Sequence, residues 1–109
     1  MSAADRIQRL RRLIVDDDSE QPRLEAGIRA WAGQDDEARR TLERVDAARI
    51  DYLRALWQEI SDDEVQATSM AHLLYVVFIG SELVVPQLTA DQVDRMYEVV
   101  LGPTLKDWA

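Results

Sequence analysis

The hydrophobic and polar positions of this chain alternate with a helical period from one end to the other. Apolar residues recur at steps of three and four, which gathers them on one face of an α-helix, and no stretch shows the strict alternation of a half-buried strand. The pattern therefore predicts an all-α fold, a five-helix bundle in which residues 1–109 form one domain. We expect helices at about residues 3–14, 22–32, 36–60, 62–84 and 89–102, with 104–109 as a tail.

Residues with familiar capping roles mark the ends of these segments. Ser2 is the predicted N-cap of the first helix. Ser61-Asp62-Asp63-Glu64 and Thr89-Ala90-Asp91-Gln92 each fit a capping box, in which two side chains satisfy each other's free backbone donors. We expect Gly33 to end the second helix in a left-handed conformation, and Gly102-Pro103 to end the fifth.

The fourth helix differs from the others because it is apolar on both sides. From Met70 to Ile79 only His72 is clearly polar, so this helix needs cover all round. A small bundle offers few neighbours, and we expect a second copy of the chain to supply the cover in a symmetric interface of four helices, two from each protomer. A compact monomer built around this helix is the alternative. The predicted homodimer interface comprises Ala67, Ala71, Leu74, Val77, Ser81, Val93, Tyr97 and Val100.

The net charge of the chain and the length of its apolar run argue against two kinds of partner, DNA and membranes. The formal net charge is -8, which repels a phosphate backbone, so we expect no direct DNA binding by this chain alone. The cluster Arg6, Arg9, Arg11 and Arg12 is interpreted as the solvated side of the first helix. No signal peptide is recognisable, and the apolar run is too short to cross a bilayer, which takes about 20 residues. We expect a soluble, cytoplasmic protein without membrane contact.

The residue types argue against catalysis. The chain has one histidine, His72, and no cysteine, so nucleophile–base pairs and thiolate metal sites find no support. The acidic run Asp16–Glu20 lacks the glycine and glutamate positions of a calcium loop and is interpreted as a solvated turn. We expect no enzymatic activity, no metal and no cofactor, and we expect His72 to be hydrogen-bonded at an interface.

Three short motifs follow one another along the predicted helices. The first is carried by Glu25, Ile28, Arg29, Trp31 and Ala32, the second by Val45, Asp46, Arg49, Tyr52 and Leu53, and the third by Leu74, Tyr75, Phe78, Ile79 and Gly80. Their order and spacing resemble the C-terminal regulatory half of TetR-family transcriptional regulators over about residues 5–101.

The resemblance implies an effector-binding and dimerisation domain of a transcriptional repressor. The helix-turn-helix with which members of this family begin has no counterpart here. We therefore expect a regulatory domain cut from a longer protein, or one whose true start lies upstream, rather than a stand-alone relative.

In such a domain the effector site is a gap among the second, third and fourth helices. Large side chains enclose the ligand there and a few polar groups orient it. Aromatic and methionine-rich walls with few ionisable groups favour a small apolar or aromatic effector. Plain core packing is the alternative for each residue. The candidate ligand-binding residues are Trp31, Tyr52, Leu56, Trp57, Met70, Leu73, Tyr75, Val76 and Phe78.

Arg49 interrupts the apolar stripe of the third helix. A charge in that position is costly unless it is paired, and Asp46, three residues earlier, is the expected partner. Alternatively, Arg49 presents its donors to an acidic effector. For the domain as a whole, the competing hypothesis is a helical protein-interaction module, an adaptor whose apolar fourth helix docks another protein without any small-molecule ligand.

Overall fold

The computed structural model describes residues 2–15 and 21–108, with side chains described for 2–15 and 25–102. All regular structure in these ranges is helical, which confirms the predicted all-α fold. The helices are α1 (Ala3–Val15), α2 (Gln21–Ala32), α3 (Asp36–Gln58), α4 (Glu64–Leu83) and α5 (Ala90–Trp108). The acidic run at residues 16–20 lies outside the described residues.

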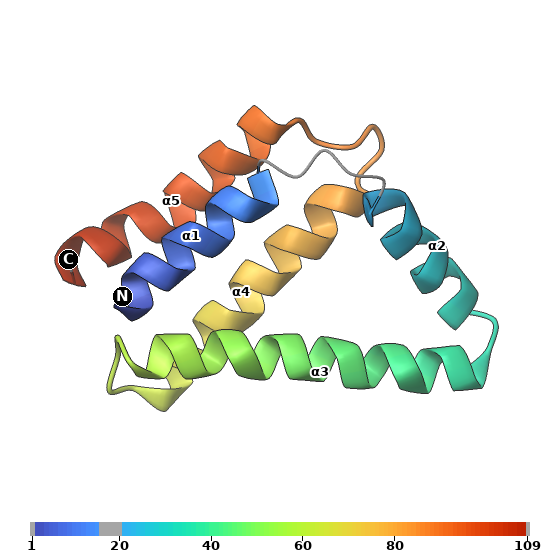
Figure 1. Cartoon of the computed structure of the whole chain (residues 1–109), viewed down its shortest axis with the longest axis horizontal. Helices are drawn as coiled ribbons and strands as arrows, with labels where there is room; N and C mark the ends of the chain where they lie inside the picture. The colour runs from blue at the N-terminus through green and yellow to red at the C-terminus, as the bar shows by residue number, and fades with distance from the viewer. Residues whose placement is uncertain (1, 16–20, 109) are drawn as a thin grey trace.

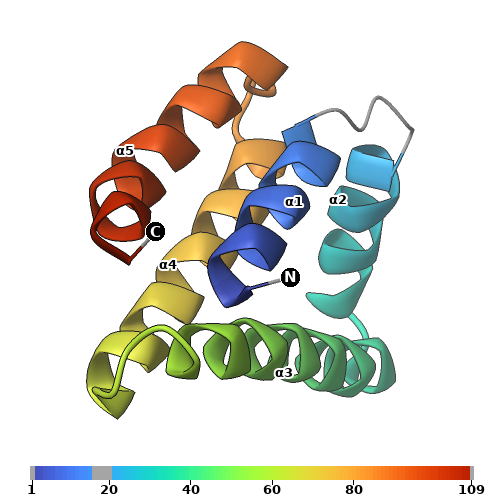
Figure 2. The same cartoon turned by 60° about the vertical axis from the view of Figure 1, so that its left-hand side comes forward.

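Three of the helices, α2, α3 and α4, form a triangular frame, and the other two, α1 and α5, pack against it as a pair. The long helix α3 runs along one edge, and α2 and α4 rise from its two ends toward each other, so the three outline a triangle (Figure 1). The other two helices, α1 and α5, pack against each other; α1 also contacts α3, and α5 contacts α4 (Figure 2). Helix α1 therefore lies between this frame and α5, in contact with both α3 and α5.

The capping predictions were right at two helix starts and wrong at three other positions. Ser2 and Thr89 both cap as expected: the Asp5 amide donates to the Ser2 hydroxyl, and the Thr89 and Gln92 backbone amides are satisfied by each other's side chains. For α4 the cap is Asp63, whose carboxylate accepts from the backbone amides of Val65 and Gln66. The helix begins at Glu64, two residues later than predicted. Gly33 has no positive φ, so the predicted left-handed cap is wrong.

Helix α5 does not stop at Gly102-Pro103 but continues to Trp108, contrary to our prediction. Gly102 keeps an ordinary helical backbone instead of the left-handed conformation of a helix end. It is buried under the side chain of Glu98, whose Oε1 would lie 2.8 Å from any added Cβ. Glycine therefore serves here to let a side chain lie across the helix, and its presence does not signal a terminus.

The core lies where α1, α3, α4 and α5 meet. Trp57 and Leu101 are its largest fully buried side chains, and Ile7, Leu53 and Tyr97 belong to the same cluster. Within residues 2–15 and 21–108, no helix is both long and apolar enough to span a membrane.

Most of the predicted dimer interface is part of this internal core, which corrects that prediction. Helix α4 contacts α2, α3 and α5 of its own chain, so one bundle covers much more of it than its composition suggested. Val77 and Val100 are partly buried and pack on the core. The other six predicted residues are buried inside the protomer: Ala67, Ala71, Leu74, Ser81, Val93 and Tyr97.

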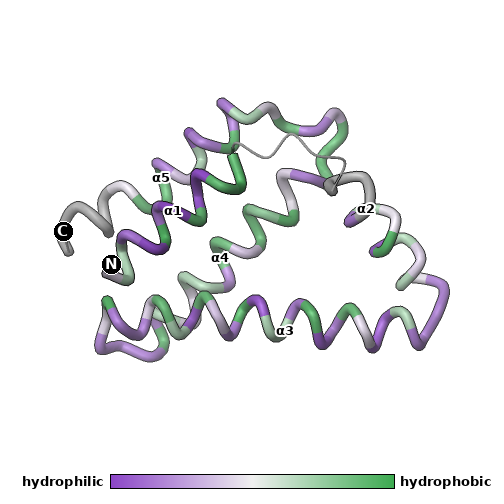
Figure 3. The backbone as a smooth tube through the Cα atoms, in the orientation of Figure 1, coloured by the Kyte–Doolittle hydropathy of each residue, from purple (hydrophilic) through white to green (hydrophobic). Residues whose placement is uncertain are grey.

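An apolar outer face nevertheless remains on α4. The helix is largely hydrophobic along its length, unlike the alternating α3 (Figure 3). Val65, Leu73 and Val76 are exposed on it, as is Val99 on α5. His72 is also exposed on α4. The apolar surface that the single chain leaves exposed on α4 and α5 is therefore made of residues other than those predicted for the dimer interface.

Candidate functional site: an apolar cavity with an ionic wall

A cavity of about 410 Å³ lies between α1, α3, α4 and α5. This volume is within the range of small-molecule sites. Tyr52 lines the cavity and is itself exposed. The lining is almost entirely apolar and aromatic, with two arginines: Ile7, Leu10, Arg11, Ile14, Ala48, Arg49, Tyr52, Leu53, Leu74, Tyr75, Phe78, Tyr97 and Leu101.

Helical spacing explains how α4 contributes to this wall. Leu74 and Phe78 are four residues apart and therefore share a face of the helix. Tyr75 lies beside them, and its ring contacts that of Phe78 at a centroid distance of 6.1 Å. The adjacent rings give the cavity an aromatic side.

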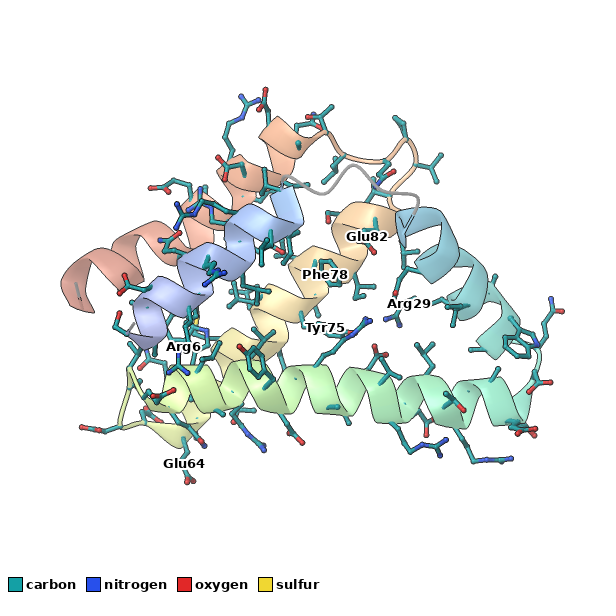
Figure 4. All side chains as sticks on the ribbon, in the orientation of Figure 1. Arg6, Arg29, Glu64, Tyr75, Phe78 and Glu82 are labelled. Carbon is teal, nitrogen blue, oxygen red and sulfur yellow. The ribbon has the colours of Figure 1, made fainter. Side chains whose placement is uncertain are left out.

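A partly buried ionic network lies directly behind this aromatic side. The guanidinium of Arg29 donates to both oxygens of Asp46, at 2.8 and 3.1 Å, and to Glu25 at 3.0 Å. The Tyr75 hydroxyl donates to Asp46 through a short hydrogen bond. Arg29 and Tyr75 extend from α2 and α4 into the triangle framed with α3 (Figure 4). The network therefore fixes α2 to α3 and orients the phenol of a cavity residue.

Arg49 joins this network through partners other than the expected one. Its guanidinium donates to the Tyr75 hydroxyl at 3.2 Å and to Glu25 at 3.3 Å. The predicted partner, Asp46, instead accepts hydrogen bonds from Arg29, which lies on α2. The sequence spacing within α3 could not reveal this competitor, because the two arginines meet only in the folded chain.

The pKa values of the network follow from these contacts. For Asp46, burial alone would raise the pKa, but hydrogen bonds from Arg29 and Tyr75 outweigh it and leave the pKa of the carboxyl below its usual 3.8. Burial, followed by the hydrogen bond to Asp46, raises the pKa of the Tyr75 phenol. The site therefore holds an ionised carboxylate and a neutral phenol at neutral pH.

The other arginine of the cavity, Arg11, uses its guanidinium to hold two helices together. It donates to the Asp94 carboxylate at 2.9 Å, to the Asp94 carbonyl at 3.0 Å and to Glu98 at 3.0 Å. These bonds tie α1 to α5. Arg11 is thus not on a solvated face as predicted, because α5 packs against that side of α1.

The predicted ligand-binding residues separate into three groups. Tyr52, Tyr75 and Phe78 line the cavity. Leu56 and Trp57 are buried in the core without lining it, and Met70 packs partly buried against that core. The remaining residues lie elsewhere: Leu73 and Val76 are on the exposed side of α4, and Trp31 borders a separate groove between α2 and α3.

The wall that α2 was expected to form is formed by α1 and α5. Helix α2 contacts α3 and α4, and its ionic network holds it against α3. Its apolar side chains within residues 25–32 lie outside the cavity. Ile7, Leu10 and Ile14 of α1 take that place, together with Tyr97 of α5. The apolar spacing of the first helix was visible in the sequence, but nothing in it showed which helices this face would meet.

Tyr97 is one of the residues predicted to form the dimer interface. It is buried within the protomer instead, and burial raises the pKa of its phenol. Among the described residues, its hydroxyl has no hydrogen-bond partner.

Comparisons of the chain with protein-family models, with characterised proteins and with solved structures give no match.

Proposed function

We propose that this chain is the effector-binding and dimerisation domain of a TetR-like transcriptional repressor, and that its effector is a small apolar or aromatic molecule. The observation that carries the proposal is the apolar cavity between α1, α3, α4 and α5. The order of the three sequence motifs supports the same function. The second and third motifs contain Tyr52 and Tyr75 of the cavity wall, and the first and second contain Arg29 and Asp46 of the network behind it.

The cavity is suited to a ligand that is mainly hydrophobic. Its walls come from four helices, and the polar groups among them are the tyrosine hydroxyls and two arginines that already have partners. An apolar molecule placed there leaves few polar groups without a hydrogen bond, whereas a sugar or nucleotide would bury many of its own.

Binding of decanol or 1-naphthol is expected to raise the melting temperature of the chain. A ligand that binds only the folded state stabilises it by about 2.7 kcal/mol at a hundredfold excess over its Kd, which corresponds to several degrees for a domain of this size. Ala48→Phe adds a ring at a lining position of α3 and should abolish the shift. Ala55→Phe, at an exposed position of the same helix outside the lining, is the control and should retain it. If neither molecule shifts the transition of the wild-type chain, the effector-binding function is wrong.

Dimerisation is proposed to use the outer face of α4 and α5. The exposed apolar residues there are Leu73, Val76 and Val99. A symmetric contact between two copies would cover this face in both protomers at once.

Val76→Arg is therefore expected to convert a dimer into a folded monomer. The side chain is exposed in the single chain, so the substitution should spare the protomer's own core. In a symmetric interface it would bring like charges together without a partner. Sedimentation equilibrium at micromolar concentration gives the mass, and circular dichroism verifies the helix content. Val45→Arg, on α3 and away from this face, is the control. A monomeric wild-type chain would contradict the dimer.

The alternative function, a helical adaptor, is favoured by a different surface. Ile28, Trp31 and Val45 are exposed around the groove between α2 and α3, which Glu25 and Arg49 also line. Exposed apolar residues of this kind also occur at protein–protein contacts. A monomeric chain that binds neither decanol nor 1-naphthol would favour the adaptor over the repressor domain.

A further inference from the structure

Three arginines lie on or directly behind the cavity wall, and they differ in how firmly they are held. The side chains of Arg11 and Arg29 are 11% and 18% exposed, and each is paired with two carboxylates. Arg49 is 38% exposed and is paired with one carboxylate, Glu25. Arg49 is therefore the arginine most accessible to an incoming anion.

The bonds of Arg49 are also longer than those that Arg29 donates to the carboxylates of the ionic network. Its contacts to Tyr75 and Glu25 measure 3.2 and 3.3 Å, and the Glu25 oxygen that it shares already accepts from Arg29 at 3.0 Å. Charge-assisted hydrogen bonds between nitrogen and a carboxylate are typically about 2.7–2.9 Å. The guanidinium of Arg49 thus has the weakest attachment of the set.

Displacing Arg49 from Glu25 would leave no buried charge unpaired. Glu25 would keep Arg29, and Asp46 would keep both Arg29 and the Tyr75 hydroxyl. An anion that binds Arg49 therefore avoids the large cost of leaving a buried ion without a partner. Neither Arg11 nor Arg29 could change partners without separating a carboxylate from its main donor.

We infer that the cavity binds an amphipathic carboxylic acid in its ionised form, with the apolar body inside the cavity and the carboxylate on Arg49. This inference rests on the proposed effector-binding function and names the chemical class of the effector. The carboxylate would take the place of Glu25, itself a carboxylate, and its two oxygens match the forked donors of a guanidinium. The apolar body would contact Leu53, Leu74 and Phe78.

The wild-type chain provides the first test, with three probes that share one alkyl tail. Isothermal titration with decanoate, decanol and decylamine compares an anionic, a neutral and a cationic head. We expect decanoate to bind at least about tenfold more tightly than decanol, as for one charge-assisted hydrogen-bonded contact. Decylamine should bind most weakly because its charge repels Arg49. Equal binding of decanoate and decanol would overturn the inference but leave the effector-binding function standing, whereas no binding of any probe would overturn both.

Arg49→Gln provides the second test. The variant should lose the preference for decanoate over decanol while it still binds decanol, because the apolar walls are unchanged. Arg54→Gln is the matched control: Arg54 is on the same helix and similarly exposed, but it pairs with Asp51 and does not line the cavity. Arg49→Lys keeps the charge and should restore part of the preference; it also serves if the glutamine variant fails to fold. If Arg49→Gln still bound decanoate more tightly than decanol, the assignment of the carboxylate to Arg49 would be overturned. Loss of that preference in Arg54→Gln would overturn it as well.

Discussion

Replacing Trp57 by alanine is expected to lower the free energy of unfolding by about 3–5 kcal/mol, the usual cost of removing a large aromatic side chain from a core. Trp57 is 1% exposed and belongs to the cluster that joins α1, α3, α4 and α5. Since domains of this kind are stable by only about 5–15 kcal/mol, the variant should unfold at a much lower urea concentration. Urea titration followed by circular dichroism measures the change.

Trp31→Ala is the matched control for this substitution. Trp31 is 60% exposed at the groove between α2 and α3, and its removal should change the free energy of unfolding by less than about 1 kcal/mol. If the two variants were equally destabilised, Trp31 would have to be part of the core and the position of α2 would be wrong.

Asp46→Asn is expected to destabilise the chain by roughly 1–3 kcal/mol at pH 7, because hydrogen bonds to charged groups contribute more than neutral ones. The substitution keeps the shape of the side chain but removes the charge that accepts from Arg29 and Tyr75. It should loosen α2, which Arg29 fixes to α3. Urea titration gives the size of the effect, and hydrogen exchange in α2 locates it.

The pH dependence of this effect has a defined sign. The pKa of Asp46 in the folded chain is lowered below 3.8, so the ionised carboxylate favours the folded state. That contribution is fully present above the pKa of an unfolded aspartate, about 3.9, and is lost as the pH falls through the lower folded value. The difference between wild type and Asp46→Asn should therefore be constant from neutral pH down to about pH 5 and shrink at more acidic pH.

Asp51→Asn is the control for both parts of this prediction. Asp51 is exposed on α3 and pairs with Arg54 on the surface. Exposed ion pairs contribute about 0–1 kcal/mol, so this variant should resemble the wild type throughout the titration. A difference between wild type and Asp46→Asn that grows toward low pH would contradict the proposed charge state of Asp46.

The helices themselves could be predicted from the sequence because their causes are local. A three-and-four spacing fixes which side of a helix is apolar, and the reciprocal bonds of Thr89 and Gln92 involve residues within one turn. Predictions failed where a local signal had a tertiary purpose. Gly102 was interpreted as a helix end, yet it lies within α5 under the side chain of Glu98.

The candidate site was predicted only in part, for the same reason. Tyr52, Tyr75 and Phe78, which the sequence predicts to bind a ligand, lie on the cavity wall, and their binding of a ligand stays a prediction. Periodicity shows that a face is apolar but does not show which helix will cover it. The sequence therefore could not distinguish the core position of Trp57 from the exposed position of Trp31.

The sequence by itself thus determined the all-α class, the approximate helices and several residues of the cavity wall. Only the tertiary structure decided that α1 and α5 close the cavity, that Arg29 takes Asp46, and that Arg49 is left with the weaker contacts. Each of these depends on distances between helices that are far apart in the chain. Such distances result from the packing of all five helices together, whereas hydrophobic periodicity and capping depend on residues within a few positions of each other.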